Sequence, residues 1–196
     1  MKSGSESGGR NDLDLLHEIG IGTYAAPLSK VLDRIARYVS SIMKCDSCFI
    51  YALDGRELVL RASRNLHAEV VDQLKIAVGQ GITGWVAEHR RSVAIAREAY
   101  LDSRFRSFNE LPEDRYEAFL SVPVMCRGNL VGVINVQHRH PYAHSSRDIT
   151  LLSTISIYVG AEIELARMEE EIWRLSKELR TLNLVEATRN SEVDKK

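Results

Sequence analysis

The sequence predicts an α+β protein with a central antiparallel sheet, helices packed against that sheet and a long C-terminal helix. Two pairs of segments with alternating side chains are joined at Asp54-Gly55 and at Gly128-Asn129. Such turns are typical of hairpins, and therefore of antiparallel pairing. Residues 28–42 carry apolar side chains every three or four positions, as one buried helical face does. A last pattern of helical period begins near Ser145 and continues past Leu182 without a helix breaker.

Composition places the chain among globular proteins. It has 196 residues, of which 44% are hydrophobic and 27% charged, enough for one domain with a substantial core. The net charge of −1 shows no basic excess of the kind that favours nucleic acid. No apolar run approaches the roughly 18–20 residues of a membrane span, and the polar N-terminus lacks the apolar region of a signal peptide. We therefore expect a cytoplasmic protein with neither membrane nor nucleic acid as a partner.

The elements follow from the changes of period along the chain. Residues 1–11 are small and polar and are expected to form a disordered leader. A first helix is predicted over 12–23, and Pro27 suits the first turn of a second helix. The remaining predictions are strands over 48–53, 57–63, 75–78, 93–96, 119–127 and 130–136, and short helices over 68–74 and 83–89. Residues 97–118 are predicted to form a long polar loop, and loops of that length are often functional.

The last helix is predicted to begin with a capping box formed by Ser145 and Asp148, with Asp in place of the usual Glu. Beyond residue 164 its apolar side chains keep the three-four spacing of a coiled-coil seam. The seam consists of Leu165, Met168, Ile172, Leu175, Leu179 and Leu182. A solitary helix would leave this seam in water, so we expect a homodimer. A parallel pair is mildly favoured, because an antiparallel pair would set Glu171 or Glu178 against another glutamate.

The predicted organisation is therefore a globular domain over 12–164, a coiled coil over 165–187 and a disordered tail over 188–196.

The stretch GQGITG, Gly79 to Gly84, has the spacing of the dinucleotide-binding fingerprint. That fold needs a full crossover helix after the glycines, and only about eight residues separate Gly84 from the next predicted strand. Binding of NAD is therefore not expected. The glycines are better interpreted as a tight backbone excursion, with Gly84 letting a short helix approach the sheet closely.

Cysteines and histidines give no metal or cofactor prediction. Cys45 and Cys48 form a lone C-x-x-C, and a structural zinc site needs four ligands, usually from two such pairs. A buried helix–strand joint is favoured for this pair, with a disulfide as a minor alternative. His138, His140 and His144 cluster around Pro141, and a solvated turn is favoured over a metal or haem site.

Three stretches carry a resemblance to a known family: VGQGITGWVAEHRRSVAI, DSRF and FLSVPVMCRGNLVGVINV. Together they resemble the GAF domain, a small-molecule sensor module of signalling proteins, over about residues 13–166. The resemblance implies helices on both faces of the sheet. The first two helices and the last helix would cover one face, and the short helices and the long loop would cap a ligand cavity on the other. With the seam described above, we expect a homodimer paired through the N- and C-terminal helices. We expect it to pass the state of a ligand to an output domain or partner protein without catalysis.

The resemblance and the strand alternation together suggest which side chains line the cavity. The strand candidates are Phe49, Tyr51, Val122, Val133 and Asn135. The cap candidates are Ile82, Trp85, Tyr100, Phe105, Phe108 and Tyr116. Phe105 and Phe108 could instead plug the core. The signatures of cyclic-nucleotide and covalent-bilin GAF domains are not evident in the loop, so both ligands are disfavoured.

Two alternative functions remain open. One GAF branch reduces free methionine sulfoxide with cysteines in the capping loops, and here such a reductase would have to use Cys126 with Cys45 or Cys48. The other alternative is a ligand-free dimerisation module with a packed core.

The segment KELRTLNLVEA, Lys177 to Ala187, resembles the lead-in to the RNA-binding ANTAR module, so the chain is similar to the N-terminal part of a GAF–ANTAR regulator. The following TRNSEVDKK departs from that pattern, and no RNA binding is expected of this chain.

Overall fold

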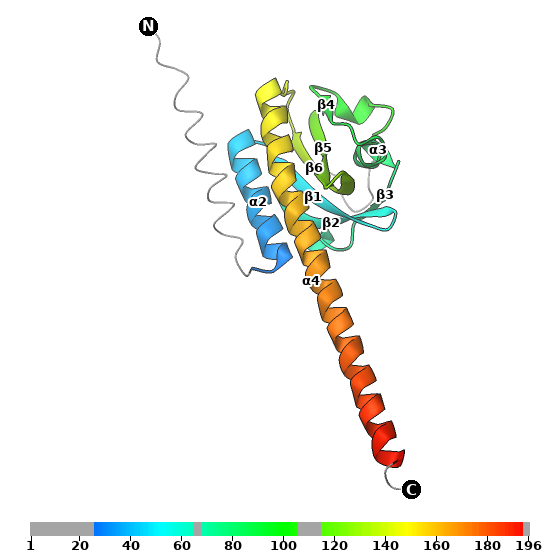
Figure 1. Ribbon diagram of the computed structural model, residues 1–196. Coiled ribbons are helices and arrows are strands. Elements are labelled where there is room, and N and C mark those ends of the chain that lie inside the picture. The colour runs from blue at the N-terminus through cyan, green and yellow to red at the C-terminus, as the bar shows by residue number, and fades with distance from the viewer. Residues whose placement is uncertain (1–25, 65–67, 106–114, 194–196) are drawn as a thin grey trace.

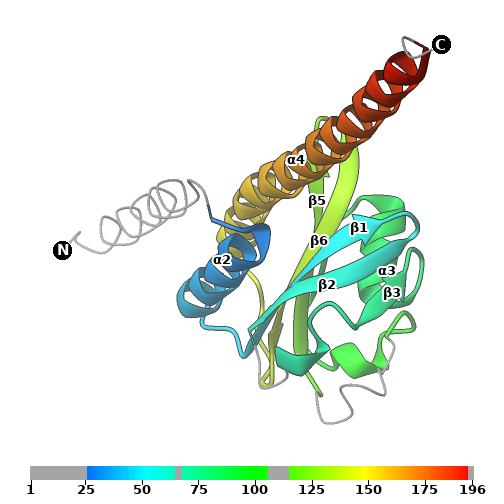
Figure 2. The ribbon, with the colours of Figure 1, turned by 90° about the horizontal axis from the view of Figure 1, so that it is seen from below.

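The computed structural model describes residues 26–64, 68–105 and 115–193, with side chains described as far as Asn183. The predicted leader over 1–11, the predicted first helix over 12–23 and the candidate Phe108 lie outside the described residues. Within them, a six-stranded antiparallel sheet has the order β3-β2-β1-β6-β5-β4. Helices α2 and α4 cover one face of the sheet, here called the helix face (Figure 1). Helix α3 and short turns cover the opposite face, here called the cap face (Figure 2).

The elements come in the predicted order. They are α2 Leu28–Met43, β1 Ser47–Asp54, β2 Glu57–Arg64, β3 Lys75–Ala77, α3 Gly81–His89, β4 Val93–Ile95, β5 Ala118–Cys126, β6 Asn129–His138 and α4 Ser146–Val193, with 3-10 turns η1 Ala68–Val70 and η2 Ala99–Leu101. This confirms the α+β class and both hairpins, β1–β2 and β5–β6. Two predicted bounds are corrected. The short helix over 68–74 contracts to the single turn η1, and α4 runs to Val193, so the predicted tail began too early.

Alternation along the central strands divides the core into two clusters. Ile50, Val122 and Ile134 lie on the helix face and pack with α2 and α4. Phe49 and Val133 lie on the cap face and pack with α3. Because the side-chain period of a strand is two, these assignments fix the face of every other residue in the same stretch of strand. Both faces of the sheet are therefore buried.

Gly84 explains the second half of the GQGITG stretch. A Cβ atom on Gly84 would lie 2.4 Å from the Ala77 carbonyl oxygen, so only glycine lets α3 sit this close to β3. Gly79 and Gly81 have φ of +89° and +67°, a left-handed backbone that glycine adopts without strain. The predicted structural interpretation of these glycines is confirmed.

Helix α4 begins with the predicted capping box. The Ser145 N–H donates to Asp148 Oδ2 at 2.8 Å, and the Asp148 N–H donates to Ser145 Oγ at 3.2 Å. One side of the following turns, Leu152, Ile155, Val159 and Ile163, is buried against the sheet. The helix then continues beyond the domain as a projecting rod (Figure 1).

The apolar composition of α4 also corrects an expectation. An 18-residue window within Ser146–Asn183 has a mean hydropathy of 1.4, so one helix is long and apolar enough to cross a membrane by length and composition alone. A core helix passes the same test. Here several of the apolar residues of α4 are buried in the core of the domain, which accounts for part of its apolar composition.

Candidate ligand-binding site

Four polar side chains lie together on the cap face, where an apolar lining would be expected. Ser47 of β1 is paired with Gln137 of β6, and Ser121 of β5 is paired with Asn135 of β6. Each shares its face with the cap-facing Phe49, Val133 and Phe119 because it lies an even number of residues along the strand from one of them. We call these four side chains, which occupy two neighbouring rows across three strands, the polar set.

The polar set is buried but incompletely hydrogen-bonded. Ser47 and Ser121 are 0% exposed, Asn135 is 1% exposed and Gln137 is 7% exposed. Among the described residues, Ser47 Oγ, Ser121 Oγ, Asn135 Oδ1 and Gln137 Oε1 each lack a hydrogen-bond partner. A buried polar atom without a partner costs about 1–3 kcal/mol, and native proteins carry few of them. Four in one patch therefore make this part of the cap face a candidate site for polar groups of another molecule.

One bond ties the polar set to the cap. Asn135 Nδ2 donates to Thr83 Oγ1 at 2.9 Å, joining the sheet to the first turn of α3. Thr83 is itself buried. The bond fixes the orientation of the Asn135 amide, so its carbonyl oxygen is the atom left for a ligand. A shift of the Asn135 side chain would therefore act directly on the first turn of α3.

An aromatic wall adjoins the polar set on β1. Phe49 and Tyr51 meet edge to face, with ring centroids 6.3 Å apart and an interplanar angle of 72°. Tyr51 is fully enclosed, and its burial, together with the nearby Tyr116, raises the pKa of its phenol well above the usual range. The Tyr51 hydroxyl is therefore neutral near pH 7. The Phe49 and Tyr51 rings offer a flat apolar surface, to which the Tyr51 hydroxyl adds one uncharged polar group.

The cap itself is held by an arginine that is already paired. Arg104 donates from Nε and Nη2 to the two carboxylate oxygens of Asp102, each at 2.8 Å. These bonds hold the pKa of the Asp102 carboxyl below its usual range. The Arg104 guanidinium also lies 4.8 Å from the centre of the Trp85 ring, and that ring stacks on His89 with 4.2 Å between the ring centroids. Arg104 therefore connects the residues after η2 to α3. Its charge is already paired with Asp102 and is not free for a ligand.

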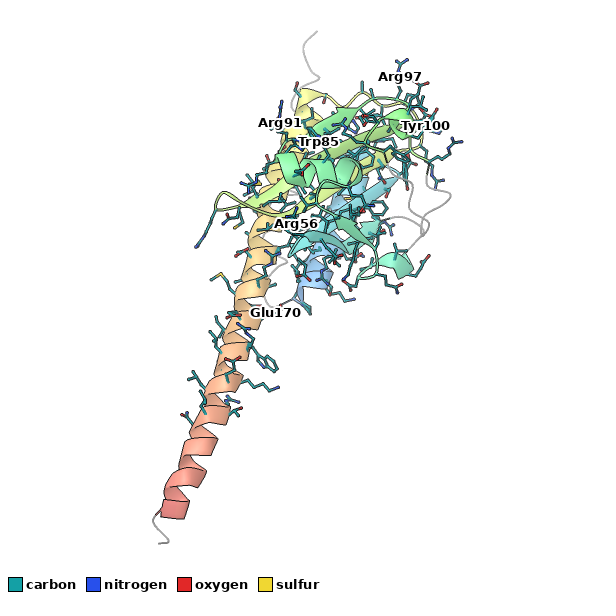
Figure 3. The ribbon with its side chains drawn as sticks, turned by 90° about the vertical axis from the view of Figure 1, so that its right-hand side faces the viewer. Arg56, Trp85, Arg91, Arg97, Tyr100 and Glu170 are labelled. Atoms are coloured by element: carbon teal, nitrogen blue, oxygen red, sulfur yellow. The ribbon has the colours of Figure 1, made fainter. Side chains whose placement is uncertain are left out.

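The structure places most of the predicted lining residues on the cap side. Phe49, Tyr51, Ile82 and Val133 belong to the cap-face cluster, and Trp85 and Phe105 pack against it. Tyr116 is buried next to Tyr51, and Tyr100 lies in η2 with Arg115 over its ring at 5.1 Å. Figure 3 shows Trp85 and Tyr100 on elements that cover the cap face.

Val122 was assigned to the wrong face. It is paired with Ile134 and belongs to the helix-face cluster, whereas its neighbours Ser121 and Pro123 face the cap. A displacement by one residue inverts the face of a strand side chain. Sequence reasoning also missed Ser47, Ser121 and Gln137. The available signal was the spacing of Asn135 and Gln137, two polar residues one period apart in an otherwise apolar strand.

The three cysteines lie away from the polar set. Cys48 is in the helix-face cluster, and Cys45 and Cys126 pack against it. Burial raises the pKa of Cys45 to about 11 and that of Cys48 well above the usual value, so both thiols are protonated near pH 7. Cys126 is at the far end of β5, roughly 20 Å from the row of Cys48, beyond the reach of a disulfide. All three are free cysteines.

The histidine turn differs from its prediction. His138 is 5% exposed and stacks on Tyr142 at 4.3 Å, with His144 at 5.2 Å, so only His140 of the three is solvated as expected. Burial and the neighbouring His138 lower the pKa of His144 to about 4, which makes the pair neutral. Among the residues that the structure describes, no group of three or more His, Cys, Asp or Glu side chains could hold a metal ion.

Comparison with known proteins gives the family. The GAF domain model matches residues 27–163. The GAF domain of the phosphoenolpyruvate-protein phosphotransferase ptsP from Coxiella burnetii is 27% identical with a TM-score of 0.76, covering 83% of this chain and 98% of that chain. Nitrogen fixation protein VnfA from Azotobacter vinelandii is 26% identical over 165 residues, covering 80% of this chain and 31% of that protein.

A more distant neighbour shares the fold alone. Free methionine-R-sulfoxide reductase from Neisseria meningitidis, solved with its substrate, is 16% identical with a TM-score of 0.69, covering 86% of this chain and 97% of that chain. The chain spans less than a third of the length of the curated relatives that it matches. The family match covers the whole sheet and the buried parts of α2 and α4 described above, and the chain belongs to the GAF domain family.

Proposed function

We propose that this GAF domain is a dimeric sensor that binds an uncharged small molecule at the polar set and relays its presence through α4. GAF domains commonly sense small molecules in signalling proteins. The observation that carries the proposal is the group of four buried polar atoms on the face that α3 covers, none of which has a partner within the described part of the chain. A ligand that satisfied these atoms would recover the free energy that their burial costs.

The chemistry of the polar set defines the ligand class. Its members are two amides and two hydroxyls, so it carries no charge. The free atoms of Asn135 and Gln137 are carbonyl oxygens, which accept hydrogen bonds. The ligand therefore carries N–H or O–H donors, and its flat part lies against the Phe49 and Tyr51 rings. These two carbonyl oxygens would repel a phosphate or carboxylate placed against them, which disfavours an anionic ligand.

The exposed seam on α4 supports the dimer. Leu165, Met168, Ile172, Leu175, Leu179 and Leu182 are between 47% and 62% exposed in the single chain. Counting back in heptads places Tyr158 and Ala161, both exposed, on the same seam beside the domain. The seam is thus longer than the sequence predicted. A second copy of α4, running parallel, would cover it along its whole length.

A direct contact links the ligand-facing sheet to the projecting helix. The Arg167 guanidinium donates a hydrogen bond to the Leu53 carbonyl at the end of β1, the strand that carries Phe49 and Tyr51. Arg167 lies three residues before Glu170, at the level where α4 leaves the domain (Figure 3). A ligand that shifted β1 would move this contact. Ligand binding would then favour one arrangement of α4 over another, as a population shift requires.

The proposal includes binding without catalysis. It is supported by the position of the three cysteines, all packed with the helix face, and by the protonated state of Cys45 and Cys48. A sulfoxide reductase needs a thiolate nucleophile beside its substrate. The output domain or partner protein that reads α4 is a further part of the proposal.

A ligand screen with matched variants tests the proposal. The melting temperature of the wild-type chain would be recorded against a library of neutral and anionic metabolites. The double variant Ser121→Ala/Asn135→Leu would be screened in parallel, with Ser29→Ala, an exposed serine of α2, as the control. We expect a neutral, donor-bearing compound to stabilise the wild type and the control but not the double variant. Stabilisation by the same compound in all three proteins would contradict the proposed site.

A further inference from the structure

A groove lies away from the cap face, at the end of the sheet where β1 begins and where β2 and β6 end. It has a volume of about 520 Å³, within the range of about 300–1,000 Å³ typical of ligand pockets. Its lining residues are Arg37, Ser40, Ser41, Cys45, Asp46, Arg64 and Arg139. We call it the arginine groove, because three guanidinium side chains from three separate elements contribute to it.

The charge of the arginine groove is only partly compensated. Arg37 pairs with Asp33 at 2.8 Å on the same helix. Asp46 lies in the groove, and its Oδ2 accepts the backbone N–H of Arg139 at 2.8 Å, a bond that leaves the Arg139 guanidinium unused. The Arg64 and Arg139 side chains form no ion pair with any residue that the structure describes. The raised pKa of Cys45 keeps that thiol uncharged, so it adds no negative charge.

The arrangement matches a tetrahedral oxyanion. Guanidinium groups present several N–H donors in a fixed plane and bind phosphate through paired hydrogen bonds. Here they line one groove from α2, from the last residue of β2 and from the residue after β6, so an anion in the groove would have donors from three elements around it. The Ser41 hydroxyl adds a short uncharged donor on the same wall. A carboxylate has two coplanar oxygens and would satisfy fewer of these donors.

We propose that the arginine groove binds a phosphate group, at a site separate from the ligand site on the cap face. The groove is open at the surface and touches α2 and the start of β1. A bound phosphate would therefore sit on the helix side of the sheet, against the elements that flank α4. This proposal does not depend on the function proposed above, because the two sites share no residue.

Titration of inorganic phosphate into the isotope-labelled full chain tests the proposal by NMR. Acetate at matched ionic strength serves as the carboxylate probe, and sodium chloride as the ionic-strength reference. The variant is Arg64→Gln/Arg139→Gln. The control is Arg56→Gln/Arg91→Gln, two exposed arginines at the β1–β2 turn and after α3 that do not line the groove (Figure 3).

We expect saturable shifts of the Ser40, Ser41, Cys45 and Asp46 amides with phosphate, at least tenfold weaker binding in the groove variant and no change in the control. Shifts no larger than those with chloride, or phosphate binding equal in both variants, would overturn the proposal. Acetate binding as tight as phosphate binding would overturn the assignment to phosphate. Well-dispersed spectra of the groove variant would establish that lost binding is not lost folding.

Discussion

Asn135 Nδ2 lies 2.9 Å from Thr83 Oγ1, in a buried bond between the central strand β6 and the first turn of α3. These residues are 52 positions apart in sequence, and their bond is the polar link between the candidate ligand site and its cap. Asn135 Oδ1, the other polar atom of this amide, has no hydrogen-bond partner in the described ranges 26–64, 68–105 and 115–193.

Removal of one partner of this bond should cost more than removal of both. Thr83→Val leaves the Asn135 amide buried and unpaired, and we expect the free energy of unfolding to fall by about 1–3 kcal/mol. The double variant Thr83→Val/Asn135→Leu replaces both groups with apolar ones, and part of that stability should return. Urea unfolding of the single and double variants measures this coupling. Strictly additive losses would show that the bond does not contribute to stability.

Gly84 should tolerate no side chain. Gly84→Ala places a methyl group 2.4 Å from the Ala77 carbonyl oxygen, and we expect a loss of about 3 kcal/mol as α3 is pushed from β3. Gly55→Ala is the matched control, because Gly55 has open space around it and a φ of +59°, and it should lose only about 1 kcal/mol. Equal losses in chemical unfolding would contradict the close approach of α3 to the sheet.

The histidine cluster predicts a pH-dependent stability. The pKa of His144 is lowered to about 4 by burial and by His138, and that of His138 is lowered mainly by burial, although Asp46 and Asp148 act against it. The unfolded chain therefore takes up protons first, at about pH 6.5, and the folded chain only near pH 4. The stability present above about pH 6.5 should fall steadily as the pH drops towards 4.

Paired variants isolate this effect. His144→Gln should reduce the loss of stability between about pH 7 and pH 4.5, because it removes the group with the larger shift. His140→Gln, at an exposed position of the same turn, should keep the wild-type slope. Urea midpoints across this pH range give the comparison. A His144→Gln slope identical to that of the wild type would show that the burial of His144 does not set the pH dependence.

The seam on α4 predicts which single substitution yields a monomer. Leu175→Lys puts a charge in the middle of the proposed interface, and we expect the mass in solution to halve. Trp173→Lys is the control, since Trp173 is 67% exposed, lies outside the seam and contacts Lys177 through its ring. Light scattering coupled to gel filtration reads both masses. A Leu175→Lys protein with the mass of the wild-type dimer would exclude this seam as the main contact.

Substitution of Arg167 should weaken the transmission of ligand binding to α4 without weakening ligand binding itself. Arg167→Leu removes the hydrogen bond to the Leu53 carbonyl while leaving the polar set intact. We expect unchanged ligand affinity but a smaller ligand-induced change in hydrogen exchange along α4. Arg174→Leu, whose partner Glu171 lies outside the domain, should behave as the wild type. A full response of α4 in the Arg167→Leu protein would require another route from the sheet.

The sequence predicted the fold well because its signals are local. The turns at Gly55 and Gly128, the capping box of Ser145 and the helical stripe of α2 each lie within one element, and each was found. The polar set was mostly missed, because its members become neighbours only through pairing between strands. Ser47 and Gln137 are far apart in sequence, and Val122 was misassigned because the face of β5 depends on its register with β6. Burial of His138 and His144 likewise depends on how the turn folds back onto Tyr142.

Native mass spectrometry of the chain purified directly from cells tests the central claim most directly, since it weighs the oligomer and any retained small molecule together. The account predicts a dimer that carries a neutral non-covalent adduct, which is released on denaturation and absent from the Ser121→Ala/Asn135→Leu variant. A monomer, or an adduct that the variant retains at the wild-type level, would contradict it.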